Sequence, residues 1–234
     1  MNNFAAVVLS AGVGSRMNSD IPKQYMDLNG KPVIYYSLKA FQDSGFSSVV
    51  LVCGKDDVEY CRKEIVEKYN LTIVKAVVAG GKERYHSVYE GLKAISSADY
   101  VFIHDGARPM VNDEIINRLK EVVTKEKTAI AGMPVKDTIN IVDSSEYIAK
   151  TPERKYVWQV QTPQCFDFST IYEAYRILIE DELSNKTVPV ITDDAMVLSY
   201  SNNMPIKMVQ ADYRNIKITT PEDLKIAELF LSEK

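Results

Sequence analysis

The feature that most constrains the fold is an alternation of short apolar runs with segments of helical spacing over the first 135 residues. The apolar runs predict strands, at residues 4–9, 48–52, 72–77, 100–103 and 128–135. The intervening segments predict helices, at residues 31–41, 56–69 and 87–95, and one after Asn112, the expected N-cap. Strands that are apolar on both faces are typical of a parallel sheet with helices on each side. The sequence therefore predicts an α/β fold with a mostly parallel sheet.

The alternation stops at residues 136–160, where β-like runs flank a turn at 143–145 and no helical period is present. This pattern predicts a β-hairpin arm, over residues 137–158, that projects from the sheet. Such an arm is too thin to enclose a core, so it needs a surface to pack against. A second copy of the chain is the simplest candidate, and we expect a homodimer.

The C-terminal part of the chain combines a strand signal with a helix start. Residues 215–219 (NIKIT) predict a closing strand. Thr220 as N-cap, Pro221 at the first helical position and Asp223 as the partner in a capping box predict a final helix. Because neither a repeat nor a second core pattern is evident, we expect residues 1–234 to form one domain.

Charge, cysteine content and hydropathy narrow the class of protein. The net charge is −4 and there is no basic run, which argues against nucleic-acid binding. Three scattered cysteines fit reduced intracellular thiols better than a disulfide framework. The longest apolar stretch is far shorter than the roughly 20 residues that cross a bilayer, and a signal-peptide pattern is absent. We therefore expect a cytoplasmic protein without a membrane segment.

A glycine-rich stretch, LSAGVGSRMNSDIPKQY, begins at the end of the first strand. Gly12 and Gly14 would leave backbone N–H groups open to a phosphate, although this spacing alone is equally compatible with a structural turn. Arg16 and Lys23 are far enough apart to bind different phosphates of one triphosphate. Met17 stands where the dinucleotide fingerprint needs its third glycine, and no Gly-Lys-Ser/Thr triplet follows. Neither a Rossmann dehydrogenase nor a P-loop NTPase therefore fits.

Further motifs resemble one family nearly end to end. They are AGVGSRM and PKQY in the first loop, GGKERYHSV at 80–88, HDGARP at 104–109, KDTI at 136–139, QTPQCF at 161–166, TDDA at 192–195 and NIKITTPEDL at 215–224. In order and separation they resemble the 2-C-methyl-D-erythritol 4-phosphate cytidylyltransferases. The resemblance implies a Rossmann-like nucleotidyltransferase sheet, an arm exchanged in a homodimer, and Mg²⁺-assisted transfer of CMP from CTP to a polyol phosphate.

The resemblance also assigns roles on the CTP side. Arg16, Lys23 and Lys217 match the family cations that stabilise charge on the α-phosphate, although spacing alone favours a surface lysine at position 217. Nucleotide contacts are expected from two loops, at Ser10, Ala11, Gly12, Gly14, Gly81, Lys82 and Ser87. Asp105 matches an aspartate near the metal and the substrate. One carboxylate is enough for Mg²⁺, which often takes only one or two in addition to phosphates.

Contacts to the polyol phosphate are expected from five residues, namely Asp105, Arg108, Thr138, Arg154 and Thr162. Arg154 is expected to serve the neighbouring subunit, whereas spacing alone favours a solvated charge. For Arg108, an internal salt bridge is an equally good alternative.

Other polar residues are interpreted as structural. Arg84 is expected to hold the second glycine loop in shape, and His86 and His104 are left outside the chemistry. Asp193 and Asp194 are interpreted as helix caps in preference to metal ligands. Three alternatives to the methylerythritol-phosphate cytidylyltransferase function remain. They are a ribitol-5-phosphate cytidylyltransferase, an NAD-dependent oxidoreductase and a non-catalytic nucleotide-binding module.

Overall fold

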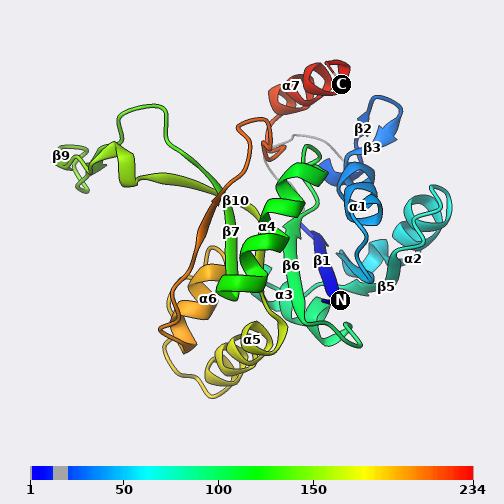
Figure 1. Ribbon diagram of the computed structural model, residues 1–234, viewed down its shortest axis with the longest axis horizontal. Helices are drawn as coiled ribbons and strands as arrows, with labels where there is room; N and C mark the ends of the chain where they lie inside the picture. Colours follow the sequence, from blue (N-terminus) through cyan, green and yellow to red (C-terminus); the bar gives the residue numbers. More distant parts are fainter. Residues whose placement is uncertain (1, 13–20, 234) are drawn as a thin grey trace.

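The structure is a computed structural model that describes residues 2–12 and 21–233. Within this part of the chain, seven strands form one sheet in the order β11-β7-β10-β6-β1-β4-β5 (Figure 1). Their bounds are β1 Phe4–Ser10, β4 Ser48–Cys53, β5 Val74–Ala79, β6 Tyr100–Asp105, β7 Thr128–Pro134, β10 Trp158–Asp167 and β11 Met208–Gln210. Of the strands described in this sheet, only β10 pairs antiparallel with its neighbours. The predicted mostly parallel α/β fold is confirmed.

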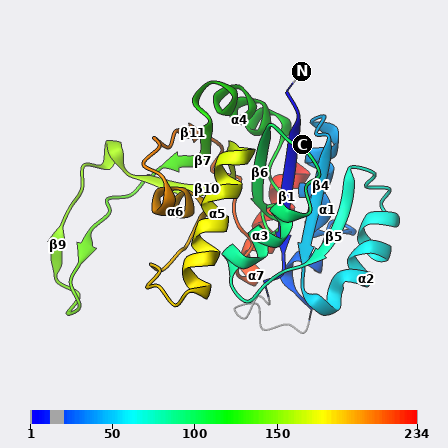
Figure 2. The same ribbon diagram turned by 90° about the horizontal axis from the view of Figure 1, so that it is seen from below.

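Helices cover both faces of the sheet (Figure 2). Their bounds are α1 Val33–Asp43, α2 Val58–Tyr60, α3 Arg84–Lys93, α4 Asp113–Glu126, α5 Phe168–Leu183, α6 Asp194–Ser201 and α7 Pro221–Ser232. The apolar cluster on one face takes side chains from α1, α4 and the helical segment around α2, and the cluster on the other face takes them from α3, α5 and α6. The described residues contain no helix with the length and apolar character needed to span a membrane.

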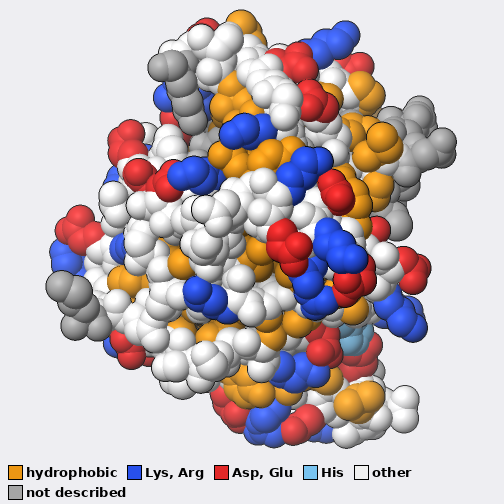
Figure 3. All heavy atoms as spheres, turned by 90° about the vertical axis from the view of Figure 1, so that its right-hand side faces the viewer, with side chains coloured by type: hydrophobic (Ala, Val, Ile, Leu, Met, Phe, Trp, Pro, Cys, Tyr) orange, Lys and Arg blue, Asp and Glu red, His pale blue; other side chains and the backbone are white. Residues whose placement is uncertain are grey.

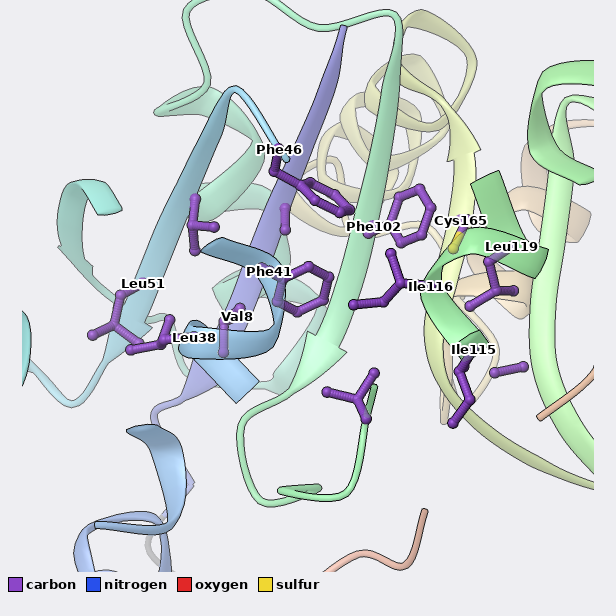
Figure 4. Packing of buried hydrophobic residues seen from close by; sticks show 14 of the residues in the cluster. Val8, Leu38, Phe41, Phe46, Leu51, Phe102, Ile115, Ile116, Leu119 and Cys165 are labelled. Carbon is purple, nitrogen blue, oxygen red and sulfur yellow. The ribbon is translucent and has the colours of Figure 1, made fainter. Parts of the chain in front are cut away.

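The alternation of side chains along β1 explains why both faces are buried. Ala6 and Val8 pack on the α1 and α4 side, whereas Ala5 and Val7 pack on the α3 side. On the first side, the ring of Phe46 lies 4.9 Å from that of Phe41 (Figure 4). The clusters hold β1 rigidly, so the residues at its carboxyl end have a fixed position.

The predicted helix caps are confirmed. Asn112 accepts a hydrogen bond from the N–H of Ile115 at 3.0 Å, and Thr220 and Asp223 form the capping box of α7. The first predicted helix begins two residues later than expected, because Lys31–Pro32 forms β3, which pairs with β2 (Asp27–Leu28).

The predicted helix at 56–69 is a composite of three short helical segments. A 3₁₀ turn at Lys55–Asp57 leads into α2, which continues as a π-helical segment at Cys61–Glu67. Cys61 and Ile65 from this segment are buried in the core.

The predicted hairpin arm is present and projects away from the sheet (Figure 1). Its strands are β8 Ile141–Val142 and β9 Ile148–Lys150, which pair antiparallel. Asp143 Oδ1 accepts hydrogen bonds from the N–H groups of Ser145 and Tyr147, which closes the turn. The predicted arm overlaps the sheet by one residue, because Trp158 already pairs with Pro134 of β7 as the first residue of β10.

The predicted strand at 215–219 was also wrong. These residues form no strand, and β11 at Met208–Gln210 takes the place beside β7 at the edge of the sheet.

The side of the molecule at the right of Figure 1 is drawn in Figure 3, where basic and acidic side chains are interspersed.

Candidate active site

A cleft of about 300 Å³ lies where β1, β5 and β6 end. Polar motifs follow each of these strands, and the carboxyl ends of parallel strands are where open α/β sheets bind their ligands. The cleft is lined by Leu9, Ser10, Ala11, Gly12, Lys23, Gln24, Gly81, Lys82, Glu83, Arg84, Ser87, Asp105, Ala107 and Lys217. Nine predicted site residues are therefore brought together, namely Ser10, Ala11, Gly12, Lys23, Gly81, Lys82, Ser87, Asp105 and Lys217. Gly14 and Arg16 lie outside the described residues.

The second glycine loop is held against the start of α3. Ser87 is buried, and its Oγ accepts a hydrogen bond from the N–H of Gly81 at 3.1 Å. A Cβ at Gly80 would lie 2.6 Å from Ser87 Oγ and 2.8 Å from Ala11 Cβ, so this close approach requires glycine. A Cβ at Gly81 would lie 2.4 Å from His86 Cβ. The loop therefore forms one wall of the cleft with little space for side chains of its own.

Lys23 begins a short 3₁₀ turn, Lys23–Tyr25, directly after Pro22. The next residue, Gln24, is buried, and its Nε2 donates to the backbone oxygens of Ser10 at 2.5 Å and Gly12 at 3.2 Å. This clamp ties the turn to the start of the first glycine loop. The turn and the loop therefore present Lys23 and the backbone of residues 10–12 to the same cleft.

Asp105 ends β6 and lies among three cationic side chains. Its Oδ2 accepts a hydrogen bond from Lys217 Nζ at 2.8 Å, and its Oδ1 lies 3.5 Å from Arg84 Nε. Arg108 Nε is 3.9 Å from Oδ2. Burial opposes ionisation of Asp105, but the charges of Arg84, Lys217 and Arg108 outweigh it and hold the pKa of this carboxyl well below its usual range. Asp105 is therefore an anion at neutral pH.

Arg84 has a larger role than the sequence indicated. Its Nη1 and Nη2 donate to the two carboxylate oxygens of Asp194 at 2.7 and 2.9 Å, and its Nε faces Asp105. Asp194 is fully buried and also accepts a hydrogen bond from Tyr175 at 2.5 Å. Asp194 therefore acts as the counter-ion of Arg84. Asp193 is the N-cap of α6 and accepts from the N–H of Met196 at 3.0 Å.

Thr162 and Arg108 lie behind the cleft and not in its lining. The N–H of Asp105 donates to Thr162 Oγ1 at 3.0 Å, and the Thr162 hydroxyl donates to His104 Nδ1 at the same distance. Arg108 Nη1 donates to the backbone oxygen of Asn215 at 2.8 Å. The Thr162 contacts hold the end of β6 against β10, and the Arg108 contact holds the loop after β6 against Asn215. Together they fix the backbone that carries Asp105.

Thr138 and Arg154 are exposed residues of the arm and do not line the cleft of their own chain. Arg154 Nη1 donates to the backbone oxygen of Lys136 at 3.1 Å. Among the described residues of one chain, therefore, these two residues do not join the candidate site residues that line the cleft.

A metal ion would find one buried carboxylate at the cleft. Residues 2–12 and 21–233 contain no group of three or more His, Cys, Asp or Glu side chains that could hold a metal. Mg²⁺ commonly takes one or two carboxylates and completes its shell with phosphate oxygens and water. Asp105 is the carboxylate of the described lining that suits such a shell, and Lys217 and Arg84 already face its two oxygens.

Comparison with known proteins decides which family has this arrangement. The family model described as 2-C-methyl-D-erythritol 4-phosphate cytidylyltransferase matches residues 4–233. The chain belongs to this family. A relative of that name from Lachnospira eligens is 51% identical over 227 residues, which cover 97% of this chain and 98% of the relative. Another of that name, from Lachnoclostridium phytofermentans, is 46% identical over 233 residues, with 100% and 98% coverage.

Solved structures in the cytidylyltransferase family share the fold. The 4-diphosphocytidyl-2C-methyl-D-erythritol synthase of Anaerococcus prevotii superposes with a TM-score of 0.83 at 32% identity, and 99% of each chain is covered. The 2-C-methyl-D-erythritol 4-phosphate cytidylyltransferase of Thermus thermophilus gives 0.76 at 25% identity, with 97% and 98% coverage. The family is one of nucleotidyltransferases, so neither an NAD-dependent oxidoreductase nor a non-catalytic module is supported. The names of these relatives also favour methylerythritol phosphate over ribitol phosphate.

Three polar side chains of the cleft were not predicted as contacts, namely Gln24, Glu83 and Arg84. Gln24 belongs to the PKQY motif, so its neighbour Lys23 was a signal for it. For Arg84, the signal was its place between the double glycine and Ser87. Its partner Asp194 is 110 residues away, which no local pattern reveals.

Proposed function

We propose that the protein transfers CMP from CTP to 2-C-methyl-D-erythritol 4-phosphate, giving 4-diphosphocytidyl-2-C-methyl-D-erythritol and pyrophosphate in the non-mevalonate isoprenoid pathway. The observation that carries the proposal is the convergence of Lys23, Lys217 and Asp105, from three separate parts of the chain, on one cleft with a glycine loop. That set suits a nucleoside triphosphate, whose charge needs cations and backbone N–H donors. We place the reaction in the cytoplasm.

The chemistry is one in-line displacement at the α-phosphorus of CTP. A phosphate oxygen of the polyol substrate forms a bond to phosphorus, the bond to the β-phosphate bridging oxygen breaks, and pyrophosphate leaves. Because the attacking oxygen is already anionic, the protein supplies positioning and charge stabilisation rather than a nucleophile. Lys23 and Lys217 are assigned the charge on the α-phosphate, with Arg16 as a third cation.

The other lining residues are assigned to the nucleotide. The backbone at Ser10, Ala11, Gly12 and Gly14 is proposed to bind phosphates. Gly81, Lys82 and Ser87 are proposed to line the cytosine site, because their loop forms the opposite wall. When Mg²⁺ is bound, it supplies further charge neutralisation of the triphosphate. Asp105 is the residue that would hold it.

The second substrate is proposed to bind with help from a partner subunit. The arm leaves apolar side chains exposed at Ile141, Val142, Tyr147 and Ile148, and a second copy of the chain would cover them. We propose a homodimer through residues 137–158 of the single domain. In this dimer, Arg154 reaches the partner's cleft, and Arg154 and Thr138 are assigned to binding of the polyol phosphate. Thr162 and Arg108 of the resident chain are assigned to the polyol-phosphate region, where they act from behind the lining by contacting Asp105.

The test is a matrix of nucleotides and acceptors. CTP, UTP, ATP and GTP are each offered with methylerythritol phosphate or ribitol phosphate, and pyrophosphate release is followed with and without Mg²⁺. We expect turnover with CTP and methylerythritol phosphate that EDTA abolishes and Mg²⁺ restores. Preference for ribitol phosphate would overturn the assigned acceptor, and preference for another nucleotide would overturn the assigned base site.

A further inference from the structure

In the described part of the chain, the backbone that carries Lys217 has no strand neighbour. Residues 215–219 form no strand, so no ladder of backbone hydrogen bonds fixes them. One backbone pair does connect this segment to the loop after β6, because the N–H of Ile218 donates to the oxygen of Ala107 at 2.8 Å. This hydrogen bond lies on the C-terminal side of Lys217, so the residues before Lys217 must be held by other contacts.

The upstream contacts are made by Asn215. This residue is fully buried, and its Nδ2 donates to Gln161 Oε1 at 3.1 Å and to the backbone oxygen of Thr162 at 2.9 Å. Its own backbone oxygen accepts from Arg108 Nη1 at 2.8 Å. Gln161 Nε2 donates in turn to the oxygen of Asp212 at 3.0 Å, so the amide pair ties the segment to β10 at two points.

These contacts enclose Lys217 on both sides. Asn215 lies two residues before it and Ile218 one residue after it. A lysine side chain has a flexible four-carbon stem, so the place of its ammonium depends on how well its backbone is held. In the structure, Lys217 Nζ lies 2.8 Å from Asp105 Oδ2 at the cleft.

We propose that Asn215 is a positioning residue for catalysis: its buried amide fixes the segment that carries Lys217 and so holds the Lys217 ammonium at the α-phosphate site. The inference rests on the proposed function, in which Lys217 stabilises charge during transfer. The same amide also holds the backbone of Thr162, whose hydroxyl accepts from the N–H of Asp105. One side chain thus sets the relative positions of the cation and the carboxylate.

Asn215→Ala removes the Nδ2 group, so Gln161 Oε1 and the backbone oxygen of Thr162 each lose a hydrogen bond. We expect kcat to fall by about tenfold or more, because small displacements of a catalytic group cost up to about 100-fold. KM for CTP should change by less than about threefold, since charge stabilisation at the α-phosphate acts mainly on kcat. A folded Asn215→Ala enzyme with the wild-type kcat would overturn the proposal.

A double-mutant cycle with Lys217→Met separates positioning from a general structural role. If Asn215 acts through Lys217, adding Asn215→Ala to Lys217→Met lowers kcat by less than about twofold. An equal loss of kcat in both backgrounds would show that Asn215 acts independently of the lysine. If Asn215→Ala does not fold, Gln161→Ala replaces it, because it removes the other partner of the same hydrogen bond. The double-mutant cycle is then measured with Gln161→Ala and Lys217→Met.

Asn112→Ala is the control variant, because it also removes an asparagine side-chain hydrogen bond, a partly buried one at the cap of α4. It should lower the thermal midpoint while leaving kcat unchanged below the transition. Absence of turnover in the wild type with CTP would refute the proposed function itself. An active wild type with equal losses in the cycle would refute only the positioning role of Asn215.

Discussion

Acid is expected to destabilise the folded protein through His104, an imidazole that is completely buried behind the cleft. Its Nδ1 accepts from the Thr162 hydroxyl at 3.0 Å, and its Nε2 lies 3.3 Å from the backbone oxygen of Arg108, to which it donates. Both contacts suit the neutral ring. Burial lowers the pKa of His104 from 6.5 to about 4, and the neighbouring Asp105 carboxylate offsets this only in part.

The sign and size of the effect follow from proton linkage. The unfolded chain binds a proton at position 104 below pH 6.5, whereas the folded chain does not until about pH 4. The contribution to stability is therefore complete above pH 6.5 and is lost as the pH falls from 6.5 towards 4. The loss is about 1 kcal/mol at pH 6 and about 2 kcal/mol at pH 5.

The assay is urea unfolding of the wild type and of His104→Gln between pH 7.5 and pH 5. Glutamine keeps a donor for the Arg108 oxygen but does not titrate. The wild type should lose about 2 kcal/mol more than the variant over this range. His86→Gln is the control, because it removes the other histidine of the chain and leaves His104 in place. Identical pH dependence in the wild type and His104→Gln would refute the reasoning.

Three further predictions test the site and the core. Lys23→Ala should lower kcat by about 100-fold or more, the scale for losing one charge-stabilising group; an unchanged kcat would remove Lys23 from its role. Arg154→Ala should raise KM for the polyol phosphate and not for CTP, and mixed dimers with Lys23→Ala subunits should regain part of the activity. A loss confined to CTP binding would contradict the exchanged arm. Gly91→Ala should destabilise the fold by about 1–2 kcal/mol in urea unfolding, because overpacking exceeds the gain in helix propensity. The new Cβ would lie 2.5 Å from Val7 Cγ1 and 2.9 Å from Val52 Cγ2. If the variant were as stable as the wild type, Val7 in β1 and Val52 in β4 would have moved to accommodate the Cβ at little cost.

Local signals were sufficient for most of the fold. The order of strands and helices in the first 135 residues, the cap at Asn112 and the capping box at Thr220 depend on neighbours within a few residues. The glycine loops and Lys23 could be assigned to one site because strands of a parallel sheet end at a common edge. The family motifs added Lys217, which its local sequence did not distinguish from a surface lysine.

Strand pairing could not be read in the same way. Residues 158–160 have the same β-like character as the arm but pair with β7 in the sheet. Residues 215–219 have a β-like pattern and yet form no strand. Asn215 at their start bonds instead to the Gln161 side chain and the Thr162 backbone oxygen of β10 and to Arg108 after β6. Whether a β-like segment becomes a strand depends on whether a sheet edge is available, which is a property of the whole fold.

The charges of the site show the same division. The sequence by itself determined which ionisable groups lie near the ends of strands. Asp105 comes shortly after the predicted strand at 100–103, and Arg84 lies in the loop after the predicted strand at 72–77. Only the tertiary structure decided their partners, because Asp105 meets Lys217 112 residues away and Arg84 meets Asp194 110 residues away. Such pairs form when the chain topology brings distant segments together in a buried environment, and that environment also gives the charges their strength.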